Sequence, residues 1–244
     1  MSTQVAPHRG GSVLDPGGCL LQARDLRKSF GPTVALDAAS VSVAAGEVVA
    51  VMGPSGSGKS TLLLCLAGIL TPDRGEAWFA GRRIDTLGDR ARTELRRREF
   101  GFVFQFGQLV PELTAEENVA LPLMLDGSRR KPAVDAARGW LDRLGLQGLG
   151  GRRSGELSGG QAQRVALARG LITKPRVLFA DEPTGALDSL TGEQVMQLLV
   201  DTARQDGTTV VLVTHEPRVA SYADRAVIVR DGRVETDADD EVDR

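Results

Sequence analysis

The sequence predicts an α/β fold built around a largely parallel β-sheet. Three short apolar runs rich in β-branched residues, at 47–52, 176–180 and 208–213, have the composition of strands that are buried on both faces. Each run ends in glycine or polar residues, and the ligands of doubly wound sheets bind beyond the carboxyl ends of the strands. We therefore expect the three strand ends to form one site.

The composition fits one large domain. The chain has 244 residues, of which 41% are hydrophobic, and this is enough for a substantial core. Its net charge of −2 gives no general attraction to nucleic acid or to a membrane surface, so we expect no nucleic-acid partner. The two cysteines, Cys19 and Cys65, match no disulfide framework and no metal spacing, which fits a reducing compartment.

The ends of the chain and its longest apolar run limit the role of a membrane. The apolar run 62–70 is much shorter than the roughly 20 residues that cross a bilayer. Residues 1–18 contain no apolar segment typical of a secretory signal, and we expect them to form a disordered leader. Residues 237–244 are expected to be a solvated acidic tail. Any role at a membrane would therefore come through a partner.

The first strand leads into the segment GPSGSGKST, which matches the phosphate-binding pattern G-x-x-x-x-G-K-S/T. The glycines let backbone N–H groups surround phosphates, Lys59 would neutralise the β- and γ-phosphates, and Ser60 would bind magnesium. The apolar run 61–70 would form the helix whose N-terminus faces the phosphates. We expect a nucleotide site that consists of Gly53, Pro54, Ser55, Gly56, Ser57, Gly58, Lys59, Ser60 and Thr61.

The other two strands end in residues that suit hydrolysis. Asp181 would hold magnesium through water, and Glu182 would polarise the attacking water as a general base. An acidic pair of this kind can also be a solvated turn, but a phosphate loop in the same chain favours the catalytic interpretation. His215 is one of two histidines and follows the strand 208–213. A single histidine is more often structural, yet this position favours contact with the γ-phosphate.

Two further residues are ambiguous from their chemistry alone. Gln105 follows the strand-like stretch FGFVF, and it could either reach the site or bond to backbone at the strand end. Phe30 could stack on an adenine ring or fill the core, and its sequence context by itself favours the core.

The segment LSGGQ predicts a helix N-terminus with an unusual start. Ser158 is a good N-cap, and Gln161 three residues later completes a capping box. The helix dipole and the open amides at such a terminus favour an anion. Capping does not explain Gly159 and Gly160, because each glycine costs roughly 1 kcal/mol of helix propensity relative to alanine. We expect a close approach to the backbone at these glycines.

The order GPSGSGKST, Gln105, LSGGQ, VLFADE, ALD at 186–188 and His215 resembles the ATP-binding subunits of ABC transporters over about 20–235. The resemblance implies an ATPase that binds ATP and Mg²⁺, with Ser60, Gln105 and Asp181 near the metal. It implies that LSGGQ of one copy, Ser158 to Gln161, closes on the ATP held by a second copy. Asp188 would then lie across the interface between the copies, and Phe30 would stack on adenine.

The resemblance also implies a fold and a place for each part. A P-loop NTPase core with a mixed sheet would carry an antiparallel β subdomain from the N-terminal third and a helical subdomain at about 107–170. The ATPase domain as a whole would span 19–236.

The stretches 100–125 and 180–189 resemble the lipoprotein-releasing and macrolide-exporting ATPases. The cell-division and antimicrobial-peptide-resistance ATPases share much of the same pattern and stay open as alternatives. A soluble ABC-type ATPase of translation or DNA repair is the alternative of a different class. The single ATPase half and the lack of a coiled-coil insertion argue against it.

The same resemblance implies a membrane partner. The ATPase would sit at the cytoplasmic face of the membrane and drive a permease of the FtsX/MacB type with a large extracytoplasmic domain. The loop after Gln105, with Phe106, Leu109, Val110 and Leu113 around Pro111, would line the groove that receives the permease. Such a loop could also be an ordinary connection into a helix that is capped by Thr114 and Glu117.

Overall fold

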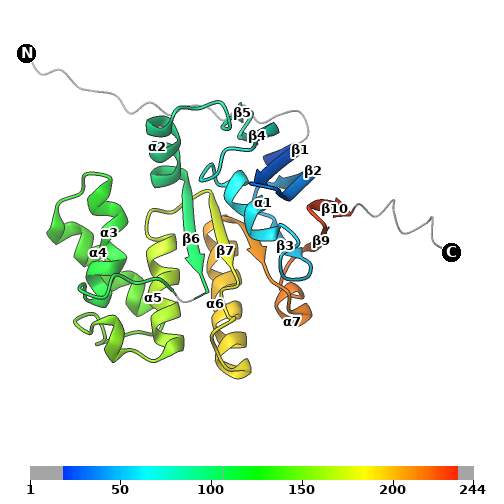
Figure 1. Cartoon of the computed structure of the whole chain (residues 1–244). Helices are drawn as coiled ribbons and strands as arrows, with labels where there is room; N and C mark the ends of the chain where they lie inside the picture. Colours follow the sequence, from blue (N-terminus) through cyan, green and yellow to red (C-terminus); the bar gives the residue numbers. More distant parts are fainter. Residues whose placement is uncertain (1–18, 106, 236–244) are drawn as a thin grey trace, which may run out of the picture.

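The computed structural model describes residues 19–105 and 107–235, which form two β-sheets with helices around them (Figure 1). The expected leader at 1–18 and the expected acidic tail at 237–244 lie outside the described residues, as does Phe106. Within the described residues, no helix has the length and apolar character needed to cross a membrane.

The N-terminal third forms a four-stranded antiparallel sheet. Its strand order is β2-β1-β4-β5, and the strands are β1 (Cys19–Phe30), β2 (Thr33–Ala44), β4 (Arg74–Phe79) and β5 (Arg82–Arg83). Buried and exposed residues alternate along much of β2, because one face of this sheet covers the core and the other faces solvent. The predicted antiparallel β portion is confirmed.

The second sheet is mixed and has the strand order β10-β9-β3-β8-β7-β6. Its strands are β3 (Val48–Met52), β6 (Phe100–Phe104), β7 (Val177–Asp181), β8 (Thr209–Val213), β9 (Arg225–Arg230) and β10 (Arg233–Glu235). All neighbours are parallel except β9 and β10. The three strands that the sequence predicted are β3, β8 and β7, side by side and parallel, so their carboxyl ends meet at one edge.

Both faces of the parallel strands are buried, as their apolar composition predicted. One face packs against α1 and the antiparallel sheet, and the other packs against the helices α3 to α6. Successive residues of β8 alternate between these two cores, with Val211 and Val213 in the first and Val210 and Leu212 in the second. The strands whose ends form the site are thus packed between two separate hydrophobic cores, one on each face of the sheet.

The helices α3, α4 and α5 gather beyond β6, at the left of Figure 1. They fall within the segment for which we expected a helical subdomain. The helices of the described chain are α1 (Lys59–Leu66), α2 (Asp89–Glu99), α3 (Ala115–Leu125), α4 (Arg130–Arg143), α5 (Gly159–Leu171), α6 (Ser189–Asp206) and α7 (Pro217–Ala220), with a 3-10 turn at Ser154–Glu156.

Candidate active site

The segment 53–58 forms a turn between β3 and the N-terminus of α1. Gly58 caps α1 with a φ of 106°, in the left-handed region, and a Cβ at this position would lie 2.3 Å from the carbonyl oxygen of Ala35. No side chain of the cap bonds the first turn of α1. The amides of that turn are therefore left for a ligand, and the helix dipole favours an anionic one.

Two side chains of this turn add hydrogen-bond donors to the backbone amides. The Lys59 ammonium is buried and donates to the carbonyl oxygen of Pro54, at 2.7 Å. The hydroxyl of Ser57 is also buried, and among the described residues it has no hydrogen-bond partner. A buried hydroxyl without a partner costs roughly 1–3 kcal/mol, so this site is incomplete by itself. Amides, an ammonium and a free hydroxyl are the donors that a phosphate group needs.

Ser60 and Asp181 meet across the end of the sheet. The Ser60 hydroxyl donates to a carboxylate oxygen of Asp181 at 3.2 Å, although the two residues are 121 positions apart. Burial raises the pKa of Asp181 above its ordinary value, the charge of Glu182 adds to the rise, and the bond from Ser60 opposes it. A bound cation would relieve this cost of burial. Mg²⁺ uses one or two such oxygen ligands together with phosphate oxygens and waters, so the pair fits the metal.

Glu182 and His215 form a second pair at the same edge. Nδ1 of His215 lies 2.7 Å from Oε1 of Glu182, and this hydrogen bond raises the pKa of the imidazole above its ordinary value. The backbone of Glu182 has a φ of 48°, which is strained for a residue with a side chain. Its N–H donates to the carbonyl oxygen of Val213 at 2.9 Å, which fixes the turn. The structure thus aims the carboxylate at the imidazole.

Gln105 follows β6 at the same edge, next to β7. A Cβ at Gly185 would lie 2.8 Å from Nε2 of Gln105, so the amide rests on the loop that follows Glu182. Among the described residues its side chain has no hydrogen bond, and the alternative of a bond to backbone at the strand end is not observed. The glutamine therefore contacts the loop that follows Glu182.

The LSGGQ segment forms the predicted capping box at the start of α5. The Gln161 N–H donates to the Ser158 hydroxyl at 3.3 Å, and the Ser158 N–H donates to Oε1 of Gln161 at 2.9 Å. Ser158 and Gly159 are exposed to solvent. The residues of α5 and those of α1 belong to different cores, on opposite faces of the sheet. The structure therefore does not join this capped glycine turn to the phosphate loop of the same chain.

Asp188 and Phe30 lie outside the cluster at the strand ends. The Asp188 carboxylate accepts from the N–H of Thr191 at 3.0 Å and caps α6; this backbone bond lowers its pKa. The Phe30 side chain is 50% exposed, at the end of β1, and the Lys28 ammonium lies 5.7 Å from its ring centroid. The alternative that Phe30 fills the core is therefore wrong, and the ring is free to stack on a ligand.

A phosphate loop, a Ser–Asp pair, a Glu–His pair and a separate capped glycine turn now stand in one chain. The family model described as ABC transporter matches residues 36–185. The chain belongs to the ABC transporter family. Within this ABC transporter family it is an ATP-binding subunit that hydrolyses ATP.

Several relatives of this ABC transporter subunit are known by name. It is 48% identical to the lipoprotein-releasing system ATP-binding protein LolD of Cereibacter sphaeroides, over 84% of this chain and 91% of that protein. It is 44% identical to LolD of Geobacter metallireducens, over 89% of this chain and 99% of that protein. The macrolide export ATP-binding/permease protein MacB of Shigella flexneri is 44% identical over 88% of this chain, which covers 34% of MacB.

The fold is similar to that of solved ABC cassettes. The ATP-binding cassette MJ0796, in a dimeric post-hydrolysis state bound to ADP and Pi, has a TM-score of 0.82 and 39% sequence identity. The similarity covers 89% of this chain and 97% of that one. The predicted fold class, a P-loop ATPase with a mixed core sheet, is confirmed.

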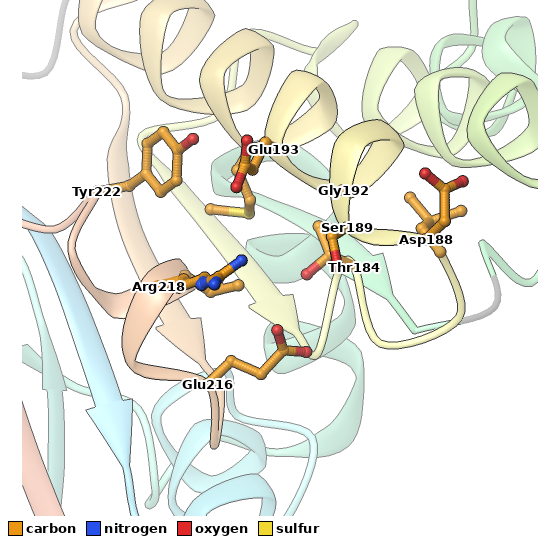
Figure 2. A pocket seen from close by; sticks show the side chains of 11 residues that line it. Thr184, Asp188, Ser189, Gly192, Glu193, Glu216, Arg218 and Tyr222 are labelled. Carbon is orange, nitrogen blue, oxygen red and sulfur yellow. The ribbon is translucent and has the colours of Figure 1, made fainter.

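A hollow of about 290 Å³ lies beside the site, between the start of α6 and α7 (Figure 2). Arg218, Glu216 and Tyr222 line one side of it, and Asp188 and Glu193 line the other. None of the residues of the phosphate loop, of the Ser60–Asp181 pair or of the Glu182–His215 pair of this ABC subunit lines the hollow.

Two residues organise the site without carrying chemistry, and the sequence alone did not predict them. Thr191 fixes Asp188, and its signal was the spacing of three residues from an aspartate that precedes a helix. Gly185 gives Gln105 its place, and no local pattern indicates that contact.

Proposed function

We propose that the chain drives a permease of the lipoprotein-releasing or macrolide-exporting type, and that two copies close on two ATP molecules to do so. The observation that carries this proposal is the meeting of the Ser60–Asp181 and Glu182–His215 pairs beside a phosphate loop. The similarity of the chain to LolD over nearly its whole length supports the type of transporter.

Each side chain then has one task. The amides of 53–58, Lys59 and the free hydroxyl of Ser57 would bind the phosphates. Ser60 and Asp181, the latter through water, would hold Mg²⁺ with Gln105 nearby, and the metal would neutralise charge on the β- and γ-phosphates. Glu182 would take the proton of the attacking water, and His215 would contact the γ-phosphate.

The capped glycine turn at the start of α5 supports a nucleotide site that is shared between two copies. Ser158 and Gly159 are exposed, and their helix belongs to the other core from the phosphate loop. A turn that cannot serve its own nucleotide is available to the nucleotide of a second copy, and MJ0796 is a cassette solved as a dimer. Asp188, which is exposed beside this turn, would lie at the same interface.

Ser158→Arg tests this interface. The arginine adds bulk and charge where the partner's γ-phosphate would dock, while the phosphate loop of the same chain is untouched. We expect ATP binding by the monomer to stay unchanged and hydrolysis to fall by about 10²-fold, the usual effect of losing donors at a reacting group. Nucleotide titration and steady-state hydrolysis measure the two effects. Normal hydrolysis in this variant would contradict the proposal of a shared site.

A groove with a volume of about 550 Å³ is the surface where we propose that the permease docks. It lies between α2, β6, α3 and α5, and most of its lining is apolar, with Phe102, Phe104 and Leu121 prominent. Leu125 is 63% exposed and Ile69 is 41% exposed at this cavity. Because β6 leads directly into Gln105, movement at the nucleotide would reach this groove.

We propose a docking surface that lies away from the loop after Gln105. Leu109, Val110 and Leu113 are half-buried, and Leu109 packs against the helical core. Asn118 is fully buried and fixes the loop: it accepts from the Val110 N–H at 2.8 Å and donates to the Leu113 carbonyl oxygen at 3.2 Å. A charge at Leu109 would therefore disturb folding as well as docking.

Leu125→Glu is the sharper test of the groove. A carboxylate in place of this apolar side chain should weaken the complex with the permease by about tenfold or more, because the charge loses its hydration when the interface closes. ATP binding by the isolated subunit should be unchanged. Ile228→Glu, on β9 away from the groove, is the control, since Ile228 is 39% exposed. Co-purification in detergent measures the complex. If both variants bind the permease equally well, the docking surface lies elsewhere.

The location follows from this partner. We propose that the subunit sits at the cytoplasmic face of the membrane, held there by its permease, and that the permease has a large extracytoplasmic domain of the FtsX/MacB type. The similarity to MacB over one third of that protein is in line with an ATPase that works with such a permease.

A further inference from the structure

Gly160, the second glycine of LSGGQ, is closed in by a residue of its own chain. A Cβ at Gly160 would lie 2.3 Å from Cγ2 of Thr191, and the next nearest atom, Cβ of Thr191, is 3.8 Å away. Separations below 3.0 Å essentially never occur for real Cβ atoms. One methyl group of Thr191 therefore excludes a side chain at Gly160.

Thr191 is itself firmly placed at the start of α6. Its N–H donates to the carboxylate of Asp188 at 3.0 Å, and this aspartate ends the loop that follows Glu182. Gly192, next to it, is buried, and a Cβ there would already touch Thr184 of the same loop, at 3.4 Å. Turning the methyl of Thr191 away would also rotate its hydroxyl, which bonds the Asp188 carboxylate at the cap of α6.

We propose that Thr191 is a positioning residue for Ser158 and Gly159, which it places through its contact with Gly160. The inference rests on the proposed role of LSGGQ at the partner's nucleotide. Because the contact leaves no free space, the start of α5 and the loop around Asp188 move as one unit. The two parts of one copy that face the second copy are thus kept in a fixed relation.

Two substitutions test the contact together. Gly160→Ala should lower kcat by about 100-fold, because the clash moves the capped turn by about an ångström. ATP binding by the monomer should not change, since the phosphate loop is intact. Thr191→Ser removes the methyl and keeps the hydroxyl; alone it should lower kcat by about two- to fivefold through the lost packing. The double variant should recover to the level of Thr191→Ser alone.

Gly159→Ala is the matched control. A Cβ at Gly159 would meet Cδ2 of Leu187 at 3.3 Å and is not near Thr191, so Thr191→Ser should give it no rescue. A double variant of Gly160→Ala and Thr191→Ser that is as inactive as Gly160→Ala would overturn the inference. It would mean that the nucleotide, not Thr191, restricts position 160 to glycine. A fully active Gly160→Ala would overturn it too.

Two further measurements keep the outcomes separate. If Gly160→Ala lowers the melting temperature, Thr191→Ser should restore it, which is the same contact seen through stability. Normal hydrolysis in Ser158→Arg would contradict the proposed function itself. If Ser158→Arg is inactive but Thr191→Ser fails to rescue Gly160→Ala, only the role of Thr191 is contradicted.

Discussion

Glu182→Gln should bind ATP normally and hydrolyse it about 10²- to 10⁴-fold more slowly, the usual range for loss of a general base. Glutamine keeps the length of the side chain and can still bond the imidazole of His215, which now lies 2.7 Å from the carboxylate. It cannot take a proton from water. With ATP and Mg²⁺ the variant should stay as a dimer, which size-exclusion chromatography and light scattering detect.

The same variant should change the titration of His215. The hydrogen bond to Glu182 raises the pKa of this imidazole, so a neutral partner should bring the pKa down toward its ordinary value. The chain has two histidines, which makes the NMR titration simple to assign. Turnover at the normal rate, or a monomer in the presence of ATP and the permease, would contradict the role of Glu182.

Lys59→Ala should weaken ATP binding by about 100-fold or more, because a charge-assisted contact to phosphate is lost. The side chain is 7% exposed, and in the structure its ammonium donates to the carbonyl oxygen of Pro54 within the same loop. No other lysine belongs to the loop 53–61. Isothermal titration with ATP and Mg²⁺ measures the loss.

Lys131→Ala is the control for Lys59→Ala, since Lys131 is exposed on α4. The melting temperature of both variants should stay close to that of the natural chain, because Lys59 makes one hydrogen bond within its own loop. ATP affinity that survives in Lys59→Ala would place the phosphates elsewhere.

The sequence by itself determined the features that depend on residues close together in the chain. The phosphate loop, the capping box of Ser158 and Gln161, and the capping box of Thr114 and Glu117 each need a fixed spacing of a few residues. The apolar runs predicted strands that are buried on both faces, and β3, β7 and β8 have this arrangement. Parallel strands of one sheet end at one edge, so the site at that edge was predictable as well.

The tertiary structure alone decided which side chains touch and which faces stay open. The hydrogen bond of Ser60 to Asp181 spans 121 positions, and only the packing of β7 beside the helix that follows β3 creates it. Phe30 is exposed because it is the last residue of β1, where the hairpin turns into β2, although its sequence context predicted core. A Cβ at Gly160 would lie 2.3 Å from a methyl group of Thr191, which belongs to a different helix. Contacts between distant segments depend on how whole helices and sheets pack, and no local spacing encodes them.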